Sequence, residues 1–407
     1  MVSPADGNGS ALATTIRELV AAELPRLVEL RRDLHMHPEV GYEEVRTGGV
    51  VLRELASAGI AHVAGLAGGT GVLAHLPGRG PRAVALRADM DALPILERGD
   101  RPWASRTPGR MHACGHDGHT AILVGAAAVL AKLSSRGGLP RPVTLVFQPA
   151  EEGGGGGRRM VEEGALDGSR IGPAVEEIYA LHGWPELPLG TVATRRGAVM
   201  AASDRFEIHV EGRGSHAAWP HRSADPIVCA AAIVTALQSI VARNVDPLDA
   251  AVVSVTVLES GSAFNVIPDR ATIKGTYRSL SEETRCMVER RLREVAEGVA
   301  SAHGCTARCE PLRGYPVTVN DDGAVERFER VARGTLGDPR VTTLPAPVMG
   351  GEDFAFYGSH VPSCYWALGL APGGGPYPPL HAPDFDFNDD AIATGVELMC
   401  RLAVRES

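Results

Sequence analysis

Apolar positions follow two different spacings along the first 190 residues of the chain. Apolar side chains three or four residues apart predict helices at 14–35, 47–58 and 120–133. Short runs rich in β-branched residues predict strands at 71–75, 83–87, 143–147 and 178–181. Because strands and helices alternate, we predict an α/β domain whose central sheet is mostly parallel and is covered on both faces.

The pattern changes after about residue 190. Strand and helix signals then follow in the order β-α-β-β-α-β, at 206–211, 224–243, 251–258, 271–278, 281–303 and 306–310. This is the order of the ferredoxin-like α+β arrangement. Helix, strand and helix patterns resume at 323–336, 363–368 and 389–404.

These patterns predict that one domain interrupts another. We expect residues 14–195 and 316–407 to form a catalytic, metal-binding α/β domain, and residues 196–315 to form the inserted domain. Residues 1–13 are expected to be a disordered tail.

The charge balance restricts the partners of this 407-residue chain. It has 49 acidic and 40 basic residues, so its formal net charge is −9. Nucleic acids and anionic membrane surfaces attract clustered Lys and Arg. We therefore exclude both as main partners and expect a small-molecule substrate.

The sequence predicts neither a membrane span nor a secretory signal. The apolar stretches at 121–131 and 227–242 are short or interrupted by polar residues, which favours buried helices. The first dozen residues lack the basic and apolar regions of a signal peptide. Seven cysteines, an odd number without a dense framework, fit a reducing compartment. We expect a cytoplasmic location.

A cluster of metal-ligand side chains precedes the helix predicted at 120–133. Cys114 and His116 lie two residues apart in the run 111–120, and Asp117 is expected to cap the helix. Residues two apart in an extended chain point the same way, so the thiolate and the imidazole can share one metal site.

Two adjacent carboxylates follow the strand predicted at 143–147. Glu151 and Glu152 come just before a glycine run, at the carboxyl end of a strand, where open α/β sheets place their sites. Adjacent side chains point apart. One glutamate can therefore bind a metal while its neighbour acts as a base on bound water.

Two further histidines extend the candidate site. His182 closes the strand predicted at 178–181, and His381 lies in a Pro-rich loop. Together with the residues above they make five ligands, which is too many for one tetrahedral structural zinc and fits a two-metal hydrolytic site. A mixed set of N, O and S ligands favours Zn, Mn, Co or Ni over Mg or Ca.

Seven motifs of the chain together resemble those of one family. They are HACGHDGHT, QPAEEGG, LHG, RADMDALP, GSHAAWPH, FNVIP and GGEDF. The resemblance extends from Leu27 to Ala403, with the motifs in the family's order. The chain resembles the amidohydrolase group of metallopeptidases that includes hippurate hydrolase, aminoacylases and auxin–amino-acid conjugate hydrolases.

The resemblance implies a metallopeptidase domain with an inserted lid domain through which the chain forms a homodimer or a larger assembly. It also implies two divalent metal ions per subunit, Zn, Mn or Co. Their ligands would be Cys114, which bridges the two ions, His116, Glu152, His182 and His381.

The same resemblance implies roles for six other residues. Glu151 would be the general base, and His216 would reach across the dimer to stabilise the oxyanion. Asn265 and Arg278 would hold the carbonyl oxygen and the carboxylate of the substrate. Asp89 and Asp91 would be acids that contact and orient the metal ligands without binding the ions themselves.

The predicted reaction is hydrolysis of the amide bond of an N-acyl-L-amino acid, which yields a carboxylic acid and a free amino acid. A dipeptidase, an aminopeptidase or an N-carbamoyl-amino-acid hydrolase could use the same site. Two other classes remain as alternatives: a metal-bound binding protein that lacks turnover, and a cysteine hydrolase built on Cys114. Only the cysteine hydrolase would survive removal of metal.

Overall fold

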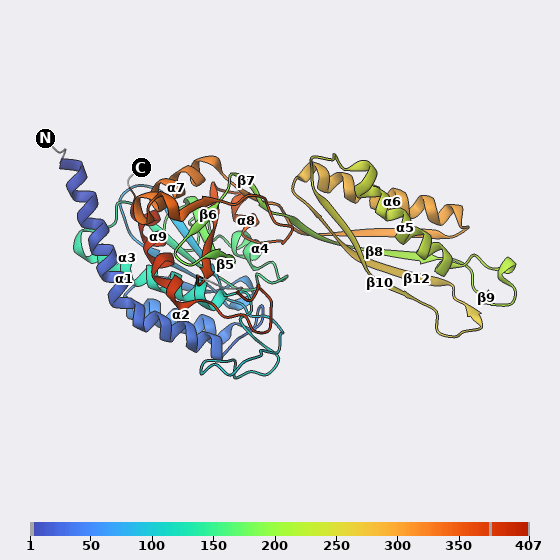
Figure 1. Ribbon diagram of the computed structural model, residues 1–407, viewed down its shortest axis with the longest axis horizontal. Helices are drawn as coiled ribbons and strands as arrows, with labels where there is room; N and C mark the ends of the chain where they lie inside the picture. The colour runs from blue at the N-terminus through green and yellow to red at the C-terminus, as the bar shows by residue number, and fades with distance from the viewer. Residues whose placement is uncertain (1–3, 374–376, 406–407) are drawn as a thin grey trace. The chain divides into compact units, whose positions relative to one another are not determined.

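The computed structural model describes residues 4–373 and 377–405, with side chains described from residue 11 onward (Figure 1). The chain folds into two compact units. Unit 1 contains the residues up to Val199, Val319–Pro345 and the residues from Asp353 onward, and unit 2 contains Met200–Thr318 and Ala346–Glu352.

The boundaries of the two units differ from the predicted ones in three places: 196–199 belong to unit 1, and 316–318 and 346–352 belong to unit 2. The largest difference is at 346–352, which was predicted in the catalytic domain. The reason is backbone pairing. The N–H of Ala201 lies 3.1 Å from the carbonyl oxygen of Val348 and 2.9 Å from that of Gly350.

Unit 1 is built on an eight-stranded sheet in the order β1-β2-β4-β3-β5-β16-β6-β15. The strands are β1 (Ala61–Leu66), β2 (Gly71–Leu76), β3 (Ala83–Asp89), β4 (Val143–Gln148), β5 (Val175–Pro188), β6 (Val192–Thr194), β15 (Val341–Thr343) and β16 (Ser363–Ala371). Strands β4, β3, β5 and β16 are parallel neighbours, so the centre of the sheet is parallel as predicted. Its β1–β2, β2–β4 and β16–β6 pairs are antiparallel.

The helices of unit 1 are α1 (Pro4–Met36), α2 (Val45–Ser57), α3 (His116–Gly137), α4 (Gly156–Glu162), α7 (Asp322–Leu336), α8 (Ala355–Gly358) and α9 (Ile392–Val404). Helix α1 corrects the predicted tail: it begins at Pro4, not after residue 13. A proline suits the first turn of a helix, but Gly7, Asn8, Gly9 and Ser10 are weak helix formers, so intrinsic propensity does not explain this early start.

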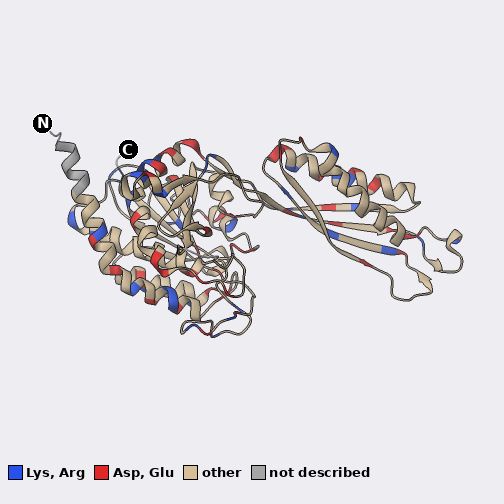
Figure 2. Cartoon of the chain, in the orientation of Figure 1, with Lys and Arg blue, Asp and Glu red and all other residues tan. Residues whose placement is uncertain are grey.

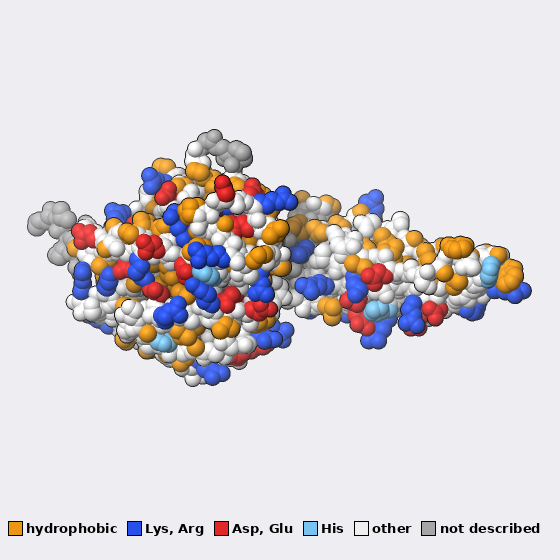
Figure 3. All heavy atoms as spheres, turned by 90° about the horizontal axis from the view of Figure 1, so that it is seen from below, with side chains coloured by type: hydrophobic (Ala, Val, Ile, Leu, Met, Phe, Trp, Pro, Cys, Tyr) orange, Lys and Arg blue, Asp and Glu red, His pale blue; other side chains and the backbone are white. Residues whose placement is uncertain are grey.

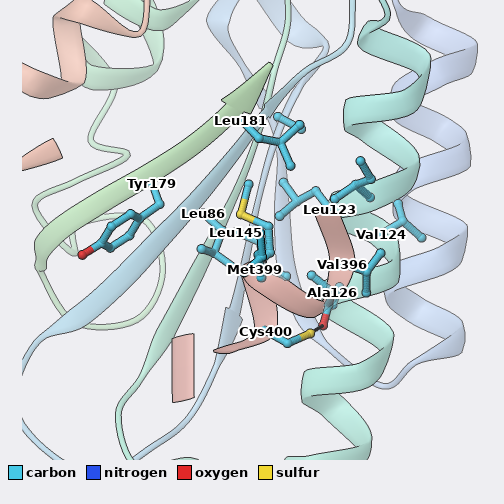
Figure 4. Close-up of a cluster of buried hydrophobic side chains, with 14 of the residues drawn as sticks. Leu86, Leu123, Val124, Ala126, Leu145, Tyr179, Leu181, Val396, Met399 and Cys400 are labelled. Atoms are coloured by element: carbon cyan, nitrogen blue, oxygen red, sulfur yellow. Dashed lines mark hydrogen bonds between the residues drawn. The ribbon is translucent and has the colours of Figure 1, made fainter. Parts of the chain in front are cut away.

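Helices α1, α3 and α9 pack against one another, and α3 and α9 also contact β3. Leucines from three strands, Leu86, Leu145 and Leu181, form a core with Leu123 of α3 and Met399 of α9 (Figure 4). Continuous apolar strands of this kind belong to a sheet that is buried.

Unit 2 has the predicted β-α-β-β-α-β order. Its elements are β8 (Ala202–Glu211), α5 (Pro226–Asn244), β10 (Ala251–Ser260), β12 (Arg270–Ser279), α6 (Glu282–Ala302) and β13 (Thr306–Tyr315). The four strands form an antiparallel sheet in the order β10-β12-β8-β13, the ferredoxin-like order. Short strands β9 (Ser215–His216) and β11 (Val266–Ile267) make a separate two-stranded ribbon, and β7 (Gly197–Met200) pairs with β14 (Thr318–Asn320).

Two helices are long and apolar enough to cross a membrane by composition alone, α3 and α5. Helix α3 is a core helix, because 72% of its most apolar window is buried inside the protein. Helix α5 packs on α6 and on β10, but only 33% of its window is buried. Arg243 is its one charged residue, whereas α6 carries charges of both signs along its length (Figure 2).

Two glycines at the start of α3 make room for a buried aromatic ring. A Cβ atom on Gly118 would lie 2.4 Å from Cγ of Phe387, and one on Gly115 would lie 3.0 Å from Cδ2 of the same ring. Gly115 also has a left-handed backbone, with φ of 88°. The segment that follows His381 therefore lies directly on the N-terminus of α3.

We predict that Gly118→Ala destabilises the protein relative to Gly137→Ala in the same helix. Both changes gain helix propensity, worth up to about 1 kcal/mol. Only Gly118→Ala pushes a methyl group into Phe387, and overpacking a core costs roughly 1–3 kcal/mol. A Cβ atom on Gly137 meets nothing within 4 Å. Denaturant unfolding measures the difference, and a Gly118→Ala variant as stable as Gly137→Ala would contradict the packing described.

Candidate metal centre

The predicted ligands of unit 1 gather at the carboxyl edge of its sheet. Asp89 ends β3, Glu152 follows the end of β4, and His182 lies in β5, beside β3. Cys114 and His116 lie at the beginning of α3. Since the carboxyl ends of parallel strands meet at one edge, residues far apart in sequence become neighbours there.

Two of the groups of potential ligand atoms share a single thiol. One group contains Cys114, His116 and His182; the other contains Cys114, Glu152 and His381. Within each group the ligand atoms lie within 4.8 Å of one another. The sulfur of Cys114 is 3.3 Å from Nε2 of His182, and Nε2 of His381 is 3.0 Å from Oε1 of Glu152. The structure thus brings all five predicted ligands together.

Two histidines are held so that Nε2 is available to a metal ion. Nδ1 of His116 lies 2.9 Å from the carbonyl oxygen of Asp91, and Nδ1 of His182 lies 2.8 Å from that of Gly183. An imidazole that donates from one ring nitrogen and presents the other is the usual arrangement of a metal ligand. Nε2 of His116 is buried and has no hydrogen-bond partner among the described residues, which a metal ion would supply.

Asp91 fixes the backbone that carries the two glutamates. Its carboxylate accepts hydrogen bonds from the N–H groups of Glu151, at 3.0 Å, and Glu152, at 2.9 Å. Glu44 accepts a third, at 2.8 Å, from Ala150, whose φ of 53° lies in the left-handed region. Burial, reinforced by Asp91, raises the pKa of Glu44 to about 7. The supporting position of Glu44 was not predicted, because nothing near it in sequence marks it.

Asp89 supports the site through a second buried network. Its Oδ1 accepts from Nδ1 of His119 at 2.7 Å, and its Oδ2 accepts from Arg87 at 2.7 Å. Arg87 also donates to Asp353 at 3.0 Å and to Gln148 at 2.9 Å. We assigned no role to Arg87, yet an arginine inside a fully buried apolar strand signals such a network, because a buried charge needs partners.

The prediction that Asp117 caps α3 is wrong. Gly115 occupies the N-cap position, and Asp117 lies inside the first turn, buried, with its carboxylate 2.8 Å from Nδ1 of His35. Burial alone lowers the pKa of His35, but Asp117 outweighs it and raises the pKa to about 9. Asp117 therefore joins α3 to α1 instead of capping its own helix.

The electrostatics of the site call for a cation. Burial raises the pKa of the Cys114 thiol well above its usual range, and neighbouring Glu152 adds to the effect. Burial also lowers the pKa of His182 well below its usual range, so its imidazole is neutral and can ligate. A thiolate beside buried carboxylates forms readily only when a metal ion neutralises it. The side chains therefore fit one or two divalent ions.

His381 lies on an irregular segment with an unusual backbone. Its φ of 65° is left-handed, and its N–H donates to the carbonyl oxygen of Ala113 at 2.7 Å. Non-glycine residues held in this region are strained and cluster at functional sites. This hydrogen bond therefore ties the strained residue His381 to the residue that precedes Cys114.

The remaining predicted residues lie in unit 2. His216 and Asn265 are neighbours in the β9–β11 ribbon: His216 pairs with Val266, and the carbonyl oxygen of Asn265 accepts from Ala217 at 3.0 Å. Both are exposed. Arg278 is not part of this ribbon; it lies near the end of β12 and is half-buried.

Comparison with known proteins places the chain in a family. The sequence profile of peptidase family M20/M25/M40 matches residues 85–405. The chain is 40% identical over 381 residues to the N-acetylcysteine deacetylase of Bacillus subtilis (strain 168), covering 93% of this chain and 96% of that protein. It is 40% identical over 386 residues to the IAA-amino acid hydrolase ILR1-like 2 of Arabidopsis thaliana, covering 93% and 84%.

A solved structure agrees with these sequence matches. The Bacillus subtilis YXEP protein, described as a dinuclear metal binding peptidase from the M20 family, superposes with a TM-score of 0.80 at 36% identity. The match covers 94% of this chain and 98% of that one. The chain therefore belongs to peptidase family M20/M25/M40 and is a hydrolase of its amidohydrolase group. This confirms the resemblance drawn from the motifs and the predicted α/β fold.

Proposed function

We propose that the protein is a metal-dependent hydrolase that cleaves the amide bond of N-acyl-L-amino acids to a carboxylic acid and a free amino acid. The observation that carries the proposal is the pair of ligand groups that share Cys114, with Glu151 beside them. The relatives support the substrate class, since one is named for N-acetylcysteine and another for IAA-amino acids.

In this proposal two divalent ions, Zn²⁺, Mn²⁺ or Co²⁺, would be held by five residues: Cys114, His116, His182, Glu152 and His381. When bound, such ions supply Lewis-acid polarisation of the scissile carbonyl and lower the pKa of bound water.

Glu151 is the proposed general base. A carboxylate oxygen of Glu151 lies within 4.8 Å of ligand atoms of His116 and Glu152, and its Oε1 accepts from the N–H of Asp353 at 3.3 Å. From this position Glu151 would take a proton from the attacking water and deliver it to the leaving amine. General base catalysis of this kind contributes roughly 10²–10⁴ in rate.

Unit 2 is the proposed lid, with Asn265 and Arg278 binding the carbonyl oxygen and the carboxylate of the substrate. We further propose that the chain forms a homodimer through unit 2, in the cytoplasm. Among the described residues, most large exposed hydrophobic side chains lie in this unit: Trp219, Ile227, Val228, Leu248, Leu258, Phe264, Val266 and Leu312. Hydrophobic side chains are visible at one end of this unit (Figure 3), and exposed apolar clusters mark interaction surfaces.

Metal-dependent release of free amino acid tests the reaction. The purified protein is offered acetyl-, benzoyl-, long-chain-acyl- and carbamoyl-amino acids and dipeptides. We expect release from an acyl-amino acid that stops with a chelator and resumes with Mn²⁺, Zn²⁺ or Co²⁺. Release only from dipeptides or carbamoyl-amino acids would favour those activities instead. Turnover that persists without metal would contradict the proposal and favour a cysteine hydrolase.

Substitution of the adjacent glutamates separates their roles. Glu151→Gln should lose at least about 10²-fold in kcat while it binds two metal ions, because only the base is removed. Glu152→Gln should lose metal, because a carboxylate ligand is replaced by an amide. Metal analysis and steady-state kinetics on both variants measure this. Identical metal content and activity in the two variants would contradict the division of labour.

Mixed dimers test the proposed action of His216 across subunits. His216→Ala alone should lower kcat by about 10²–10³, the usual cost of one oxyanion donor. A dimer that pairs a His216→Ala subunit with a Glu151→Gln subunit should regain up to half the wild-type activity, because one site has both intact groups. No activity in the mixed dimer, with both parents folded and dimeric, would show that His216 does not act in trans.

A further inference from the structure

A fully buried arginine lies behind the candidate metal centre, in a position that sequence analysis did not indicate. Arg31 lies near the C-terminal end of α1, five residues before Met36, and has no exposed surface. Its Nη1 donates to Asp386 at 2.7 Å, and its Nε donates to Asp389 at 2.7 Å. Nη1 also lies 3.4 Å from Oδ2 of Asp117. One guanidinium therefore contacts three carboxylates.

These carboxylates belong to the two segments that carry the candidate ligands. Asp117 directly follows His116 on the first turn of α3. Asp386 and Asp389 follow His381 in the segment that leads to α9. Arg31 thus joins the start of α3 to the chain beyond His381. Within the described part of the chain, no other side chain that contacts Asp386 or Asp389 also contacts Asp117.

The segment beyond His381 depends on a few attachments. Phe387 packs on Gly118, and the N–H of His381 donates to Ala113. The exposed side chain of His381 itself contacts Glu152, the other candidate ligand. Without Arg31, Asp117 and Asp386 would face each other with less positive charge between them. Losing one partner of a buried ion pair is costly, because it leaves an uncompensated charge.

We propose that Arg31 is a positioning residue for the metal centre: it holds the His381 segment against α3, so that the imidazole of His381 stays opposite Cys114 and Glu152. This inference rests on the proposed metal site. Arginine suits the task because its planar fork reaches several carboxylates at once, whereas the point charge of lysine does not.

The neighbouring Arg32 provides a matched control. It is on the same helix and donates to the same Asp389, with Nε at 2.9 Å from Oδ2. Its side chain is 39% exposed, and it lies over the ring of Trp103, with Cζ 3.8 Å from the ring centroid. Arg32 contacts Asp389 and Trp103 but not Asp117 among the described residues, so it does not connect the two segments.

Calorimetric titration of the chelator-treated full chain with Mn²⁺ tests the proposal. The wild type should bind two ions. Arg31→Lys should bind one ion with unchanged affinity and the other 10–100-fold more weakly, the usual loss when a residue behind a ligand is changed. Arg32→Lys should match the wild type. Two ions bound with wild-type affinity by Arg31→Lys would overturn the proposal.

A double variant separates positioning from a general loss of stability. His381→Ala should weaken the same ion, and adding Arg31→Lys to it should cause no further loss, because the arginine acts through His381. Additive losses in the double variant would overturn the proposal. If Arg31→Lys does not fold, Asp386→Asn takes its place in both titrations, because it removes one of the carboxylates that Arg31 contacts. A wild type that binds no Mn²⁺, Zn²⁺ or Co²⁺ would instead overturn the proposed metal centre itself.

Discussion

The concentration of buried acids at one edge of the sheet is the constraint on which the rest of unit 1 depends. The carboxylates gathered there are Glu44, Asp89, Asp91, Glu151, Glu152 and Asp353. Such a group is stable only if each oxygen has a donor or a cation. Backbone N–H groups satisfy Asp91 and Glu44, Arg87 satisfies Asp89 and Asp353, and the open ligand atoms around Cys114 are left for metal ions.

In this arrangement, residues that support the ligands are buried, whereas residues that would contact the substrate lie on connecting segments. Of the supporting residues, Arg87 and Asp89 lie on β3 and His119 lies on the first turn of α3, and both elements are buried there. The residues that would meet the substrate lie on short connections after the strands, at Glu151 and Glu152, and on the strained segment at His381. A site of this kind is accurate because packed elements hold its ligands and loops hold only what must face solvent.

Sequence patterns identified four of the five ligand candidates because each stands beside an apolar run that can be recognised. Cys114 and His116 precede the apolar part of a helix, and Glu152 follows an apolar strand. His182 follows the apolar run 178–181, although β5 continues beyond it to Pro188. The sheet topology then brings the ends together. The helical start of α1 at Pro4 was missed because Gly7, Asn8, Gly9 and Ser10 disfavour a helix. The place of 346–352 in unit 2 was missed because it depends on backbone pairing with Ala201, which periodicity does not reveal.

The supporting residues were missed for a different reason. Arg31 meets Asp386 and Asp389 across more than 350 positions of the chain, and Glu44 meets Ala150 across 106. No local spacing predicts contacts of this range. The N-cap role expected for Asp117 was wrong because a buried histidine and a buried arginine from α1 compete for its carboxylate. Tertiary charge pairing overrode the local preference.

Anomalous diffraction from crystals grown with Mn²⁺ or Zn²⁺ tests the central claim most directly, because it locates the ions themselves. The account predicts two peaks in unit 1 that flank the sulfur of Cys114, one beside His116 and His182 and the other beside Glu152 and His381. Peaks elsewhere, or a cysteine sulfur that touches no metal ion, would contradict it.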